Sequence, residues 1–532
     1  MVTPDDITVY AKELSRKSLL FFGVYYFSKL IPKTPPSVHV ELCENLQSDH
    51  GDFLGFIPRG GGKSVWTTTI TPLWEKLCHD VPFQVGYSQT DTQAVKLFRD
   101  LIEPVLDSES YSLLHSDFSK ELSVERQNDH EIVFADGCAI LFSSRGASTR
   151  GLKHNGNRPW RIFFDDLEND ESVATLLQRD KTWDWINRSV RPMLDPEHGR
   201  LIWVGTLLHE DACMTRAEKS GAFTVMKRSS ILKDADRQDL WEEWERVWDT
   251  ATLASENGRD AARAFYEQHQ EEMDNGADVL WQERFPYEFL RAKKREVGSF
   301  AFATEYQNHP AASENQIITD SDVVNFHGAV VTERGQPETW LIDDIGMRVR
   351  LQDITLVITV DPAISEKTTA DYFVVMVVGA HANGTRWVLD MKRDRLPIAG
   401  QVQAVLEMYG SWKARANVTT IGIETVAYQK ALKQLLDAAG RSVGISLPTR
   451  ELKPGTHDKI MRLSRWQPSF ERKEIRIQKT VHASLLEEIT GFTRDGKLRP
   501  SHDDTVDALT YALDLLEGLV AHGKPQGGFW WR

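Results

Sequence analysis

Short apolar runs alternate with segments of helical periodicity over the first 235 residues. Phe53 to Ile57 is apolar and leads into a proline and a glycine cluster, and a threonine-rich segment follows from Lys63. That order predicts a strand, a tight loop and a helix. Because strands that alternate with helices are typical of α/β proteins, we expect an α/β fold with a mainly parallel sheet. The other predictions of this kind are strands at Val81–Ser88, Arg161–Phe164 and Leu201–Val204 and a helix at Thr90–Leu106.

Two further patterns complete the first half of the chain. The apolar runs Glu131–Phe134 and Cys138–Phe142 flank Ala135-Asp136-Gly137, and this spacing predicts a β-hairpin. Residues 1–30 have helical character, with an apolar and aromatic run at Leu19–Tyr26, and a proline-rich break follows at Ile31–Ser37. We expect Leu19–Tyr26 to form the buried face of a helix.

The pattern changes after the last of these strands. Residues 236–300 are rich in Glu, Arg, Trp and Ala at helical spacing, and a second α/β pattern starts at Thr355–Val360. The last fourteen residues contain glycines and end in Phe-Trp-Trp-Arg, which is typical of a loose tail. The predicted parts are an α/β domain at 1–310 with a helical lid at about 236–310, a linker at 311–350, a second α/β domain at 351–518 and a tail at 519–532.

Composition narrows the classes of protein that fit. A chain of 532 residues is too long for one compact core. The net charge of −15 argues against a surface covered in basic residues, although a local basic groove for DNA can lie on an acidic body. Four scattered cysteines without a C-x-x-C pair favour a reducing compartment. We expect no membrane association, because no apolar run reaches the length of a membrane span and the N-terminus lacks the features of a secretory signal.

The first candidate site is Pro58-Arg59-Gly60-Gly61-Gly62-Lys63-Ser64. A glycine-rich turn between a strand and a helix lets backbone N–H groups surround a phosphate, while Lys63 reaches the β- and γ-phosphates and Ser64 binds Mg²⁺. The complete motif has another glycine where this chain has Ile57. A glycine-rich surface turn is the alternative, and the strand before the loop and the helix after it favour the phosphate site.

The second candidate site follows the strand at residues 162–164, which ends in Asp165-Asp166-Leu167-Glu168. An apolar strand that ends in carboxylates suits nucleotide-bound Mg²⁺, with a further carboxylate to orient the attacking water. We expect Asp165 on the Mg²⁺ side and Asp166 in the water-orienting role, with Glu168 as its rival. The alternative is an acidic strand end that caps the next helix. It is the weaker interpretation, because a phosphate loop lies upstream.

Two weaker signals accompany these motifs. The segment Ser143–Trp160 contains Arg145, Arg150 and Arg158, and such a loop can stabilise charge during phosphoryl transfer or contact DNA phosphates. For each single arginine a solvated basic loop remains the alternative. Gly205-Thr206 follows the strand at 201–204; such a pair can sense the γ-phosphate, but it is also common in turns.

The second half carries a different set of acidic residues. Asp361 follows the buried strand Ile358–Val360, and Glu424 ends the β-rich segment Val418–Ile423. Far downstream, Asp503, Asp504 and Asp507 share one helical face by their spacing. Two strand-end carboxylates and a helix-borne one suit a two-metal phosphodiester nuclease, and oxygen ligands favour Mg²⁺ or Mn²⁺ over zinc. Each acid alone is more often structural, so the prediction rests on their combination.

The ordered set of motifs resembles that of the large terminase subunits of tailed bacteriophages, and the resemblance covers most of the chain. The motifs around Asp361, around Glu424 and at His502–Leu509 are specific in combination. The matching segments are Arg59–Ser64, Arg150-Gly151-Leu152, Arg158-Pro159, Asp165–Glu168, Gly205-Thr206, Gly298-Ser299-Phe300, Tyr306–Pro310, Asp361-Pro362-Ala363, Ile423-Glu424, His502-Asp503-Asp504 and Asp507-Ala508-Leu509.

The resemblance implies an ASCE-type P-loop ATPase with a helical lid, joined to an RNase H-like nuclease. It implies that the loop Arg59–Ser64 binds ATP with Mg²⁺, and that Asp165 is the Mg²⁺ carboxylate. Thr206 belongs to the motif that couples ATP hydrolysis to movement, and Arg150 is the best candidate for an arginine that acts on a neighbouring subunit. Many members have Glu where this chain has Asp166, so the water-orienting role stays open between Asp166 and Glu168.

In the second half the resemblance implies that Asp361, Glu424 and Asp504 are nuclease metal ligands. Asp503, Asp507 and Asp371 are further candidates around the same metals. Mn²⁺ is expected to substitute for Mg²⁺ there.

The function that the resemblance implies is viral genome packaging: ATP-driven translocation of double-stranded DNA into the procapsid and endonucleolytic cleavage of concatemeric DNA. The implied partners are viral DNA, the portal protein and a small terminase subunit, with a homo-oligomeric ring during packaging and a monomer in solution as an alternative. The expected location is the host cytoplasm and, transiently, the portal vertex of the procapsid, but not the mature virion. A helicase-nuclease of DNA repair and a non-catalytic ATP-binding assembly protein are the alternative functions.

Overall fold

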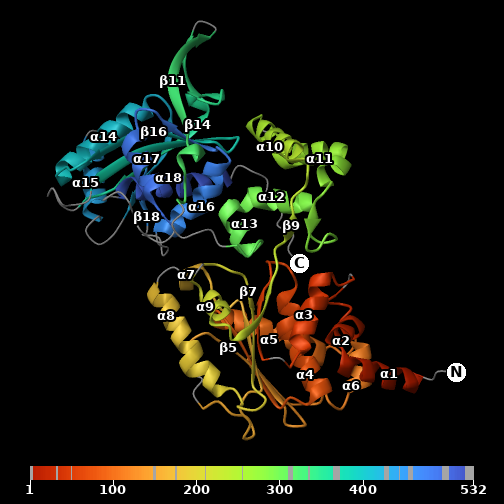
Figure 1. Ribbon diagram of the computed structural model, residues 1–532. Coiled ribbons are helices and arrows are strands. Elements are labelled where there is room, and N and C mark those ends of the chain that lie inside the picture. The colour runs from red at the N-terminus through yellow and green to blue at the C-terminus, as the bar shows by residue number, and fades with distance from the viewer. Residues whose placement is uncertain are drawn as a thin grey trace. The chain divides into compact units, whose positions relative to one another are not determined.

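The computed structural model describes most of the chain, which divides into two compact units. The first unit is Met1–Arg237 with Asp274–Ala312, and the second is Gln238–Met273 with Ser313–Arg532. Each unit is described by itself below (Figure 1). The described residues are 4–31, 34–49, 51–147, 151–173, 176–209, 211–254, 256–309, 316–333, 336–363, 372–424, 430–442, 444–452, 459–493 and 503–521.

The first unit is built on an eight-stranded sheet with the order β3-β4-β5-β2-β6-β7-β1-β8. All neighbours are parallel except the β3–β4 and β4–β5 pairs. The strands are β1 (Asp52–Phe56), β2 (Phe83–Ser88), β3 (Val124–Gln127), β4 (Glu131–Phe134), β5 (Ala139–Ser144), β6 (Arg161–Asp165), β7 (Arg200–Gly205) and β8 (Phe223–Lys227), and a separate pair is β9 (Ile231–Lys233) with β10 (Asp278–Val279).

Helices cover both faces of this sheet because its strands alternate their side chains between two apolar layers. Phe53, Phe163 and Ile202 pack in one core cluster with helices that precede or flank the phosphate loop, and Leu54 and Trp203 pack in a second cluster on the opposite face. The helical segments are α1 (Pro4–Lys17), α2 (Leu19–Tyr26), α3 (Ser37–Gln47), η1 (Val65–Ile70), α4 (Thr71–His79), α5 (Asp91–Leu106), α6 (Ser112–Phe118), α7 (Asp170–Val173), α8 (Leu176–Trp185), η2 (Ile186–Val190), η3 (Arg191–Met193), α9 (Cys213–Ser220), α12 (Tyr287–Val297) and α13 (Ser299–Glu305).

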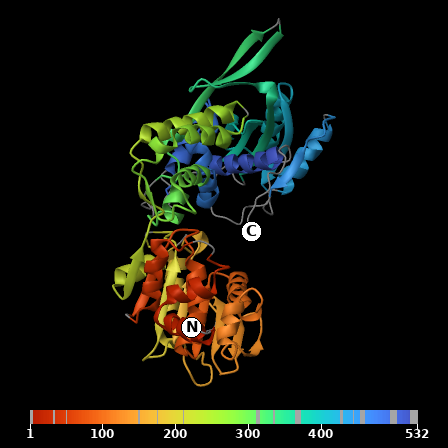
Figure 2. The ribbon, with the colours of Figure 1, turned by 90° about the vertical axis from the view of Figure 1, so that its right-hand side faces the viewer.

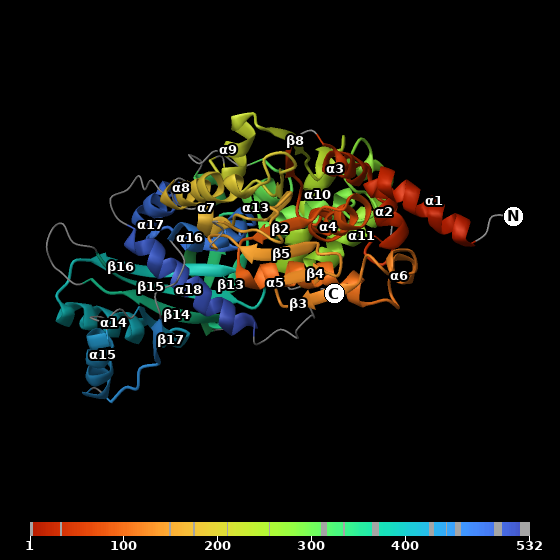
Figure 3. The same ribbon diagram turned by 90° about the horizontal axis from the view of Figure 1, so that it is seen from below.

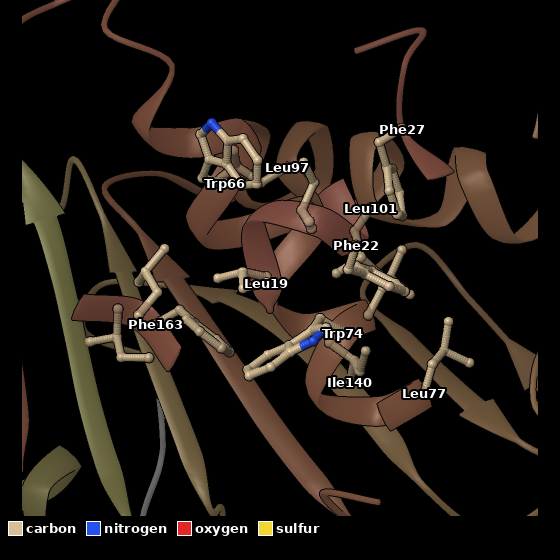
Figure 4. Packing of buried hydrophobic residues seen from close by; sticks show 14 of the residues in the cluster. Leu19, Phe22, Phe27, Trp66, Trp74, Leu77, Leu97, Leu101, Ile140 and Phe163 are labelled. Carbon is tan, nitrogen blue, oxygen red and sulfur yellow. The ribbon is translucent and has the colours of Figure 1, made fainter. Parts of the chain in front are cut away.

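The first core cluster explains the apolar run near the N-terminus. Leu19 and Phe22 of α2 are fully buried and pack with Trp66, Trp74 and Phe163 (Figure 4). Burial of a side chain of this size contributes about 1.5–3 kcal/mol. The predicted buried helix face is therefore confirmed, although Ser18 separates α1 from α2 by capping the Phe21 amide at 3.1 Å.

Strand β7 lies between the strand that leads into the glycine-rich loop and the strand that ends in Asp165. Phe56 of β1 lies opposite Gly205, and Asp165 of β6 lies opposite Val204. Because these strands are parallel, the loop, Thr206 and Asp166 follow the same edge of the sheet. An additional strand in this position defines the ASCE type of P-loop fold, so the expected fold class of this half is confirmed, as is the β4–β5 hairpin.

The second unit contains a nine-stranded sheet with the order β13-β12-β11-β19-β16-β15-β14-β17-β18. Strands β14, β15 and β16 form an antiparallel meander, and β17 and β18 add to it in parallel. The strands are β11 (Val324–Glu333), β12 (Gln336–Asp343), β13 (Arg348–Arg350), β14 (Ile354–Asp361), β15 (Phe373–His381), β16 (Arg386–Asp394), β17 (Asn417–Glu424), β18 (Thr449–Leu452) and β19 (Ile475–Gln478).

This sheet also carries helices on both faces. Val374 and Met376 share a core cluster with α16–α18, whereas Phe373 and Val375 share another with α14 and α15. Figure 3 shows α14 and α15 on the opposite side of β14 from α16 and α17, and Figure 2 shows the β11–β12 hairpin projecting from the sheet. The helical segments are α10 (Gln238–Leu253), α11 (Gly258–Asp274), η4 (Asp320–Asp322), η5 (Leu351–Asp353), α14 (Ile398–Lys413), α15 (Lys430–Ser442), α16 (Lys459–Glu471), α17 (His482–Gly491) and α18 (Asp504–Ala521).

The segment predicted as a helical lid is helical, but its contacts divide it. Helices α10 and α11 group with the second unit, and α12 and α13 group with the first. The boundaries of the lid, the linker and the two domains stay predictions. Within the described part of the chain, no helix is both long and apolar enough to cross a membrane.

Candidate nucleotide and nuclease sites

The glycine-rich loop adopts a conformation that only small residues permit. Gly60 and Gly62 have φ values of 77° and 81°, in the left-handed region that favours glycine. A Cβ atom on Gly62 would lie 2.7 Å from His39 Nε2. The same ring nitrogen of His39 lies 2.7 Å from the Gly61 carbonyl oxygen. His39 of α3 therefore contacts the loop directly and leaves no room for a side chain at Gly62.

The side chains after the loop reach the end of β6. Lys63 is buried, and its Nζ lies 3.2 Å from Asp166 Oδ2. Burial and the charge of Asp166 raise the pKa of Asp165 to about 7, while Lys63 and a hydrogen bond from Ser64 oppose that shift. Lys63, Ser64, Asp165 and Asp166 are thus brought together at the carboxyl edge of the sheet.

Asp165 offers a place for a divalent cation. The residue is 1% exposed, and its Oδ1 atom is buried without a hydrogen-bond partner among the described residues. An unpaired buried carboxylate oxygen is costly unless a cation or a donor satisfies it. Mg²⁺ held between Asp165 and Ser64 fits this chemistry.

Asp166 and Glu168 differ sharply in what surrounds them. Asp166 has a φ of 41° and faces Lys63. Glu168 is buried, and its two oxygens accept hydrogen bonds from the Cys213 and Met214 amides at 2.8 and 3.1 Å. Those amides begin α9, so Glu168 acts as an anchor for a helix N-terminus. Of the two carboxylates, Asp166 is the one that faces Lys63 of the loop.

The other predicted residues of the first unit are only partly described. Arg150 lies outside the described residues. Arg59 is largely exposed and pairs with Glu305 at 2.6 Å, and Arg158 donates to the Pro192 carbonyl at 3.1 Å. Thr206 is half-buried at the end of β7.

Two further residues near this edge make contacts that the pattern of the sequence does not predict. Asn308 is buried, with a φ of 48°, and its side chain accepts from the Leu207 amide and donates to the Arg228 carbonyl. His39 is the other. Asn308 stands in the segment Tyr306–Pro310, which the resemblance singled out without giving it a role, whereas a single His at position 39 gives no spacing from which its contact could be predicted.

In the second unit, two predicted carboxylates lie on adjacent strands. Asp361 ends β14 and Glu424 ends β17, and these parallel strands pair Val360 with Ile423. Both carboxylates therefore emerge at one edge. Helix α18 begins with Asp504 at that edge and packs on β14 through a hydrogen bond from Thr359 Oγ1 to the Ala508 carbonyl at 2.8 Å.

The charges of this carboxylate cluster act on one another. Burial raises the pKa of Asp361 well above its usual range, and the charges of Glu424, Asp507 and Asp504 raise it further. Glu424 accepts a hydrogen bond from the Tyr511 hydroxyl at 2.8 Å. Such a concentration of buried negative charge fits divalent cations with oxygen ligands. As they stand, however, no three His, Cys, Asp or Glu side chains among the described residues are grouped closely enough to hold a metal ion.

Asp503 and Asp507 are engaged by cationic side chains of α16. Lys459 Nζ lies 2.8 Å from Asp503 Oδ1 and 2.6 Å from Asp507 Oδ2, and Arg462 pairs with the other oxygen of Asp507. Burial alone would lower the pKa of Lys459, but the charges of Asp507 and Asp503 raise it overall. Their proposed role as metal ligands therefore competes with these ion pairs. Asp371 and His502 lie outside the described residues.

The fold and the geometry define a class of protein: a P-loop ATPase unit of the ASCE type joined in one chain to an RNase H-like nuclease unit. Residues 358–516 match the family model described as the terminase RNaseH-like domain. This match assigns that segment to the terminase RNase H-like domains and confirms the resemblance to a terminase large subunit.

Solved structures of phage terminases are also similar to this chain. The large terminase of the thermophilic bacteriophage D6E has 10% identity and a TM-score of 0.45, over 89% of this chain and 98% of that one. The large terminase of bacteriophage HK97 has 12% identity and a TM-score of 0.31, over 90% of this chain and 93% of that one. No curated protein matches the chain.

Proposed function

We propose that this protein is the motor subunit that packages viral DNA: it hydrolyses ATP to translocate double-stranded DNA into a procapsid and cuts concatemeric DNA at a two-metal nuclease site. The observation that carries the proposal is the position of Asp361, Glu424 and Asp504 at one edge of a sheet whose residues 358–516 match the terminase nuclease domain. The same chain carries a nucleotide site of the ASCE type, so one polypeptide combines a motor with a nuclease.

In the motor unit, the loop Arg59–Ser64 binds the phosphates of ATP. Lys63 neutralises charge on the transferred phosphoryl group and Asp166 orients the attacking water. Asp165 and Ser64 would hold Mg²⁺, which would supply positive charge to offset that of the phosphates. Glu168 holds the N-terminus of α9 beside the site, and Thr206 at the end of β7 transmits the state of the nucleotide. Arg150 acts on the nucleotide of a neighbouring subunit.

In the nuclease unit, Asp361, Glu424 and Asp504 hold divalent cations, with Asp503 and Asp507 as further candidates. Mg²⁺ or Mn²⁺ held by these residues would supply an activated water and stabilisation of the leaving oxygen. The Tyr511 hydroxyl keeps Glu424 oriented, because it donates to one carboxylate oxygen. The Tyr372 amide likewise donates to Asp504 Oδ2 at 3.0 Å.

The partners proposed for this cycle are double-stranded viral DNA, the portal protein of the procapsid and a small terminase subunit. The protein works as a homo-oligomeric ring during packaging. It acts in the host cytoplasm and at the portal vertex.

The first experiment is digestion of closed-circular plasmid with Mg²⁺ or Mn²⁺ by the wild type and by Asp361→Ala. Closed circles have no ends, so cleavage by the wild type but not by the variant supports an endonuclease at the proposed site. Digestion of linear DNA alone would favour an end-dependent enzyme of DNA repair. Equal cleavage by the wild type and the variant would mean that the nuclease site is wrongly assigned.

A further inference from the structure

The N-terminus of α16 brings a cation to the carboxylate cluster. Lys459 is the first residue of that helix, and its ammonium group bridges Asp503 and Asp507. Its side chain is 34% exposed, whereas that of Asp507 is 10% exposed. The Lys459 ammonium group is therefore held by two carboxylates, while its side chain stays accessible to solvent.

Both carboxylate oxygens of Asp507 face cationic groups. One of its oxygens faces Lys459 and the other faces Arg462, whose side chain is 13% exposed. The Arg462 guanidinium lies 4.9 Å from the centre of the Tyr511 ring, and the Tyr511 hydroxyl donates to Glu424. A continuous set of contacts thus connects Lys459 to one of the proposed metal ligands.

We propose that Lys459 binds a phosphate of the DNA strand at the nuclease site, and that Asp507 and Arg462 position it there. The inference rests on the proposed nuclease function. An ammonium group has three N–H donors. Two of them face Asp503 and Asp507, and among the described residues no further ion pair engages the group, so one N–H donor can reach a phosphate oxygen.

The charge balance of the site requires such a contact. Asp361, Glu424 and Asp504 repel the phosphates that must approach them, and lysine contacts to phosphate are the usual source of sequence-independent affinity for DNA. The ion pairs of Lys459 are with Asp503 and Asp507, the two further candidates. Lys459 therefore adds positive charge beside Asp361, Glu424 and Asp504 without pairing with any of these three proposed ligands.

The test compares the full-length wild type with Lys459→Ala, Lys459→Arg and a matched control, Lys433→Ala. Lys433 also pairs with an aspartate, Asp437, at 3.0 Å, but it lies on α15 outside the carboxylate cluster. Three quantities are measured: plasmid cleavage with Mg²⁺, affinity for a short duplex in Ca²⁺ over a series of salt concentrations, and Mn²⁺ binding by calorimetry.

Loss of one phosphate contact is expected to reduce the slope of log affinity against log salt by about 0.9 in Lys459→Ala. Cleavage should fall by roughly 10- to 100-fold, with Lys459→Arg partly restored and Mn²⁺ stoichiometry unchanged. Lys433→Ala should match the wild type in all three.

An unchanged salt slope in Lys459→Ala would overturn the inference, and so would loss of Mn²⁺ binding, because Lys459 would then only organise the carboxylates. The two proposals fail separately. A wild type that cuts no DNA contradicts the nuclease function, whereas a wild type that cuts, an inactive Asp361→Ala and an unaffected Lys459→Ala contradict only this inference.

Discussion

Single residues at both sites act through short contacts to groups that are distant in the sequence. His39 belongs to α3, yet its ring contacts the Gly61 carbonyl of the loop. Trp66 and Trp281 lie against the ring with centroids 5.7 and 4.8 Å away. Burial lowers the pKa of His39, so the ring is neutral at pH 7 and donates one hydrogen bond. His39 is thus a positioning residue for the phosphate loop.

His39→Ala is expected to raise the KM for ATP and lower kcat, because the Gly61 carbonyl loses its donor and the loop its support. Loss of a buried hydrogen bond of this kind costs about 1–3 kcal/mol. Steady-state ATPase kinetics check the prediction. His115→Ala is the control, because His115 Nε2 also contacts a backbone carbonyl, that of Pro104 at 3.0 Å, away from the loop. Equal kinetics for both variants would contradict the role of His39.

At the scale of elements, α17 fixes the start of α18 and with it Asp504. Glu488 of α17 accepts from the Thr505 amide at 2.9 Å and from the Thr505 hydroxyl. Burial raises the pKa of Glu488 to about 7, although Thr505 and Arg393 oppose the shift. The pKa in the folded state exceeds that of an unfolded chain, so the stability that this proton contributes is present at low pH and lost as pH rises through about 7.

The second unit should therefore become less stable between pH 6 and pH 8, by about 1 kcal/mol from this group alone. Glu488→Gln cannot ionise and should show a smaller fall. Thermal unfolding of the full chain at both pH values measures the difference. The control is Glu487→Gln, which alters the adjacent, exposed carboxylate and should keep the wild-type pH dependence. If Glu488→Gln also keeps the wild-type pH dependence, the titration of Glu488 is not the cause of the fall in stability.

The elements also show what the pattern of the sequence could predict. The fully buried strands β2 and β7 were predicted because apolar runs with no exposed face leave few other interpretations. The edge strand β8 is not predicted, because only Phe223 and Met226 of its five residues are buried and they give no regular pattern. The same holds for the sites: carboxylates at strand ends are visible from the sequence. The Lys459–Asp507 and His39–Gly61 contacts depend on tertiary packing and cannot be predicted from the sequence.

At the scale of the whole molecule, the two proposed activities belong to different units. The Lys63–Asp166 pair lies in the first unit, and Asp361 with its neighbours lies in the second. The two sites have no residue in common. The two chemistries are therefore expected to respond to different substitutions.

Lys63→Ala should lower ATP turnover by at least about 100-fold, since a preorganised charge at the transferred phosphate is lost, and should spare plasmid cleavage. Asp361→Ala should do the reverse. Phosphate release and plasmid nicking, measured on the same preparations of both variants, check this. Removal of divalent cations by a chelator should stop both reactions. A Lys63→Ala protein that neither hydrolyses ATP nor cuts plasmid would show that the units are coupled.

The course of the chain between the units has a practical consequence. Because α10 and α11 group with the second unit, the polypeptide changes units at residues 237/238, 273/274 and 312/313. One proteolytic cut after residue 312 would therefore leave a fragment that carries a pair of helices without the unit they pack in. Trp241 and Trp244, both fully buried in the intact chain, belong to that pair. We therefore expect the first unit to be isolated better by replacing 238–273 with a short link than by a single truncation.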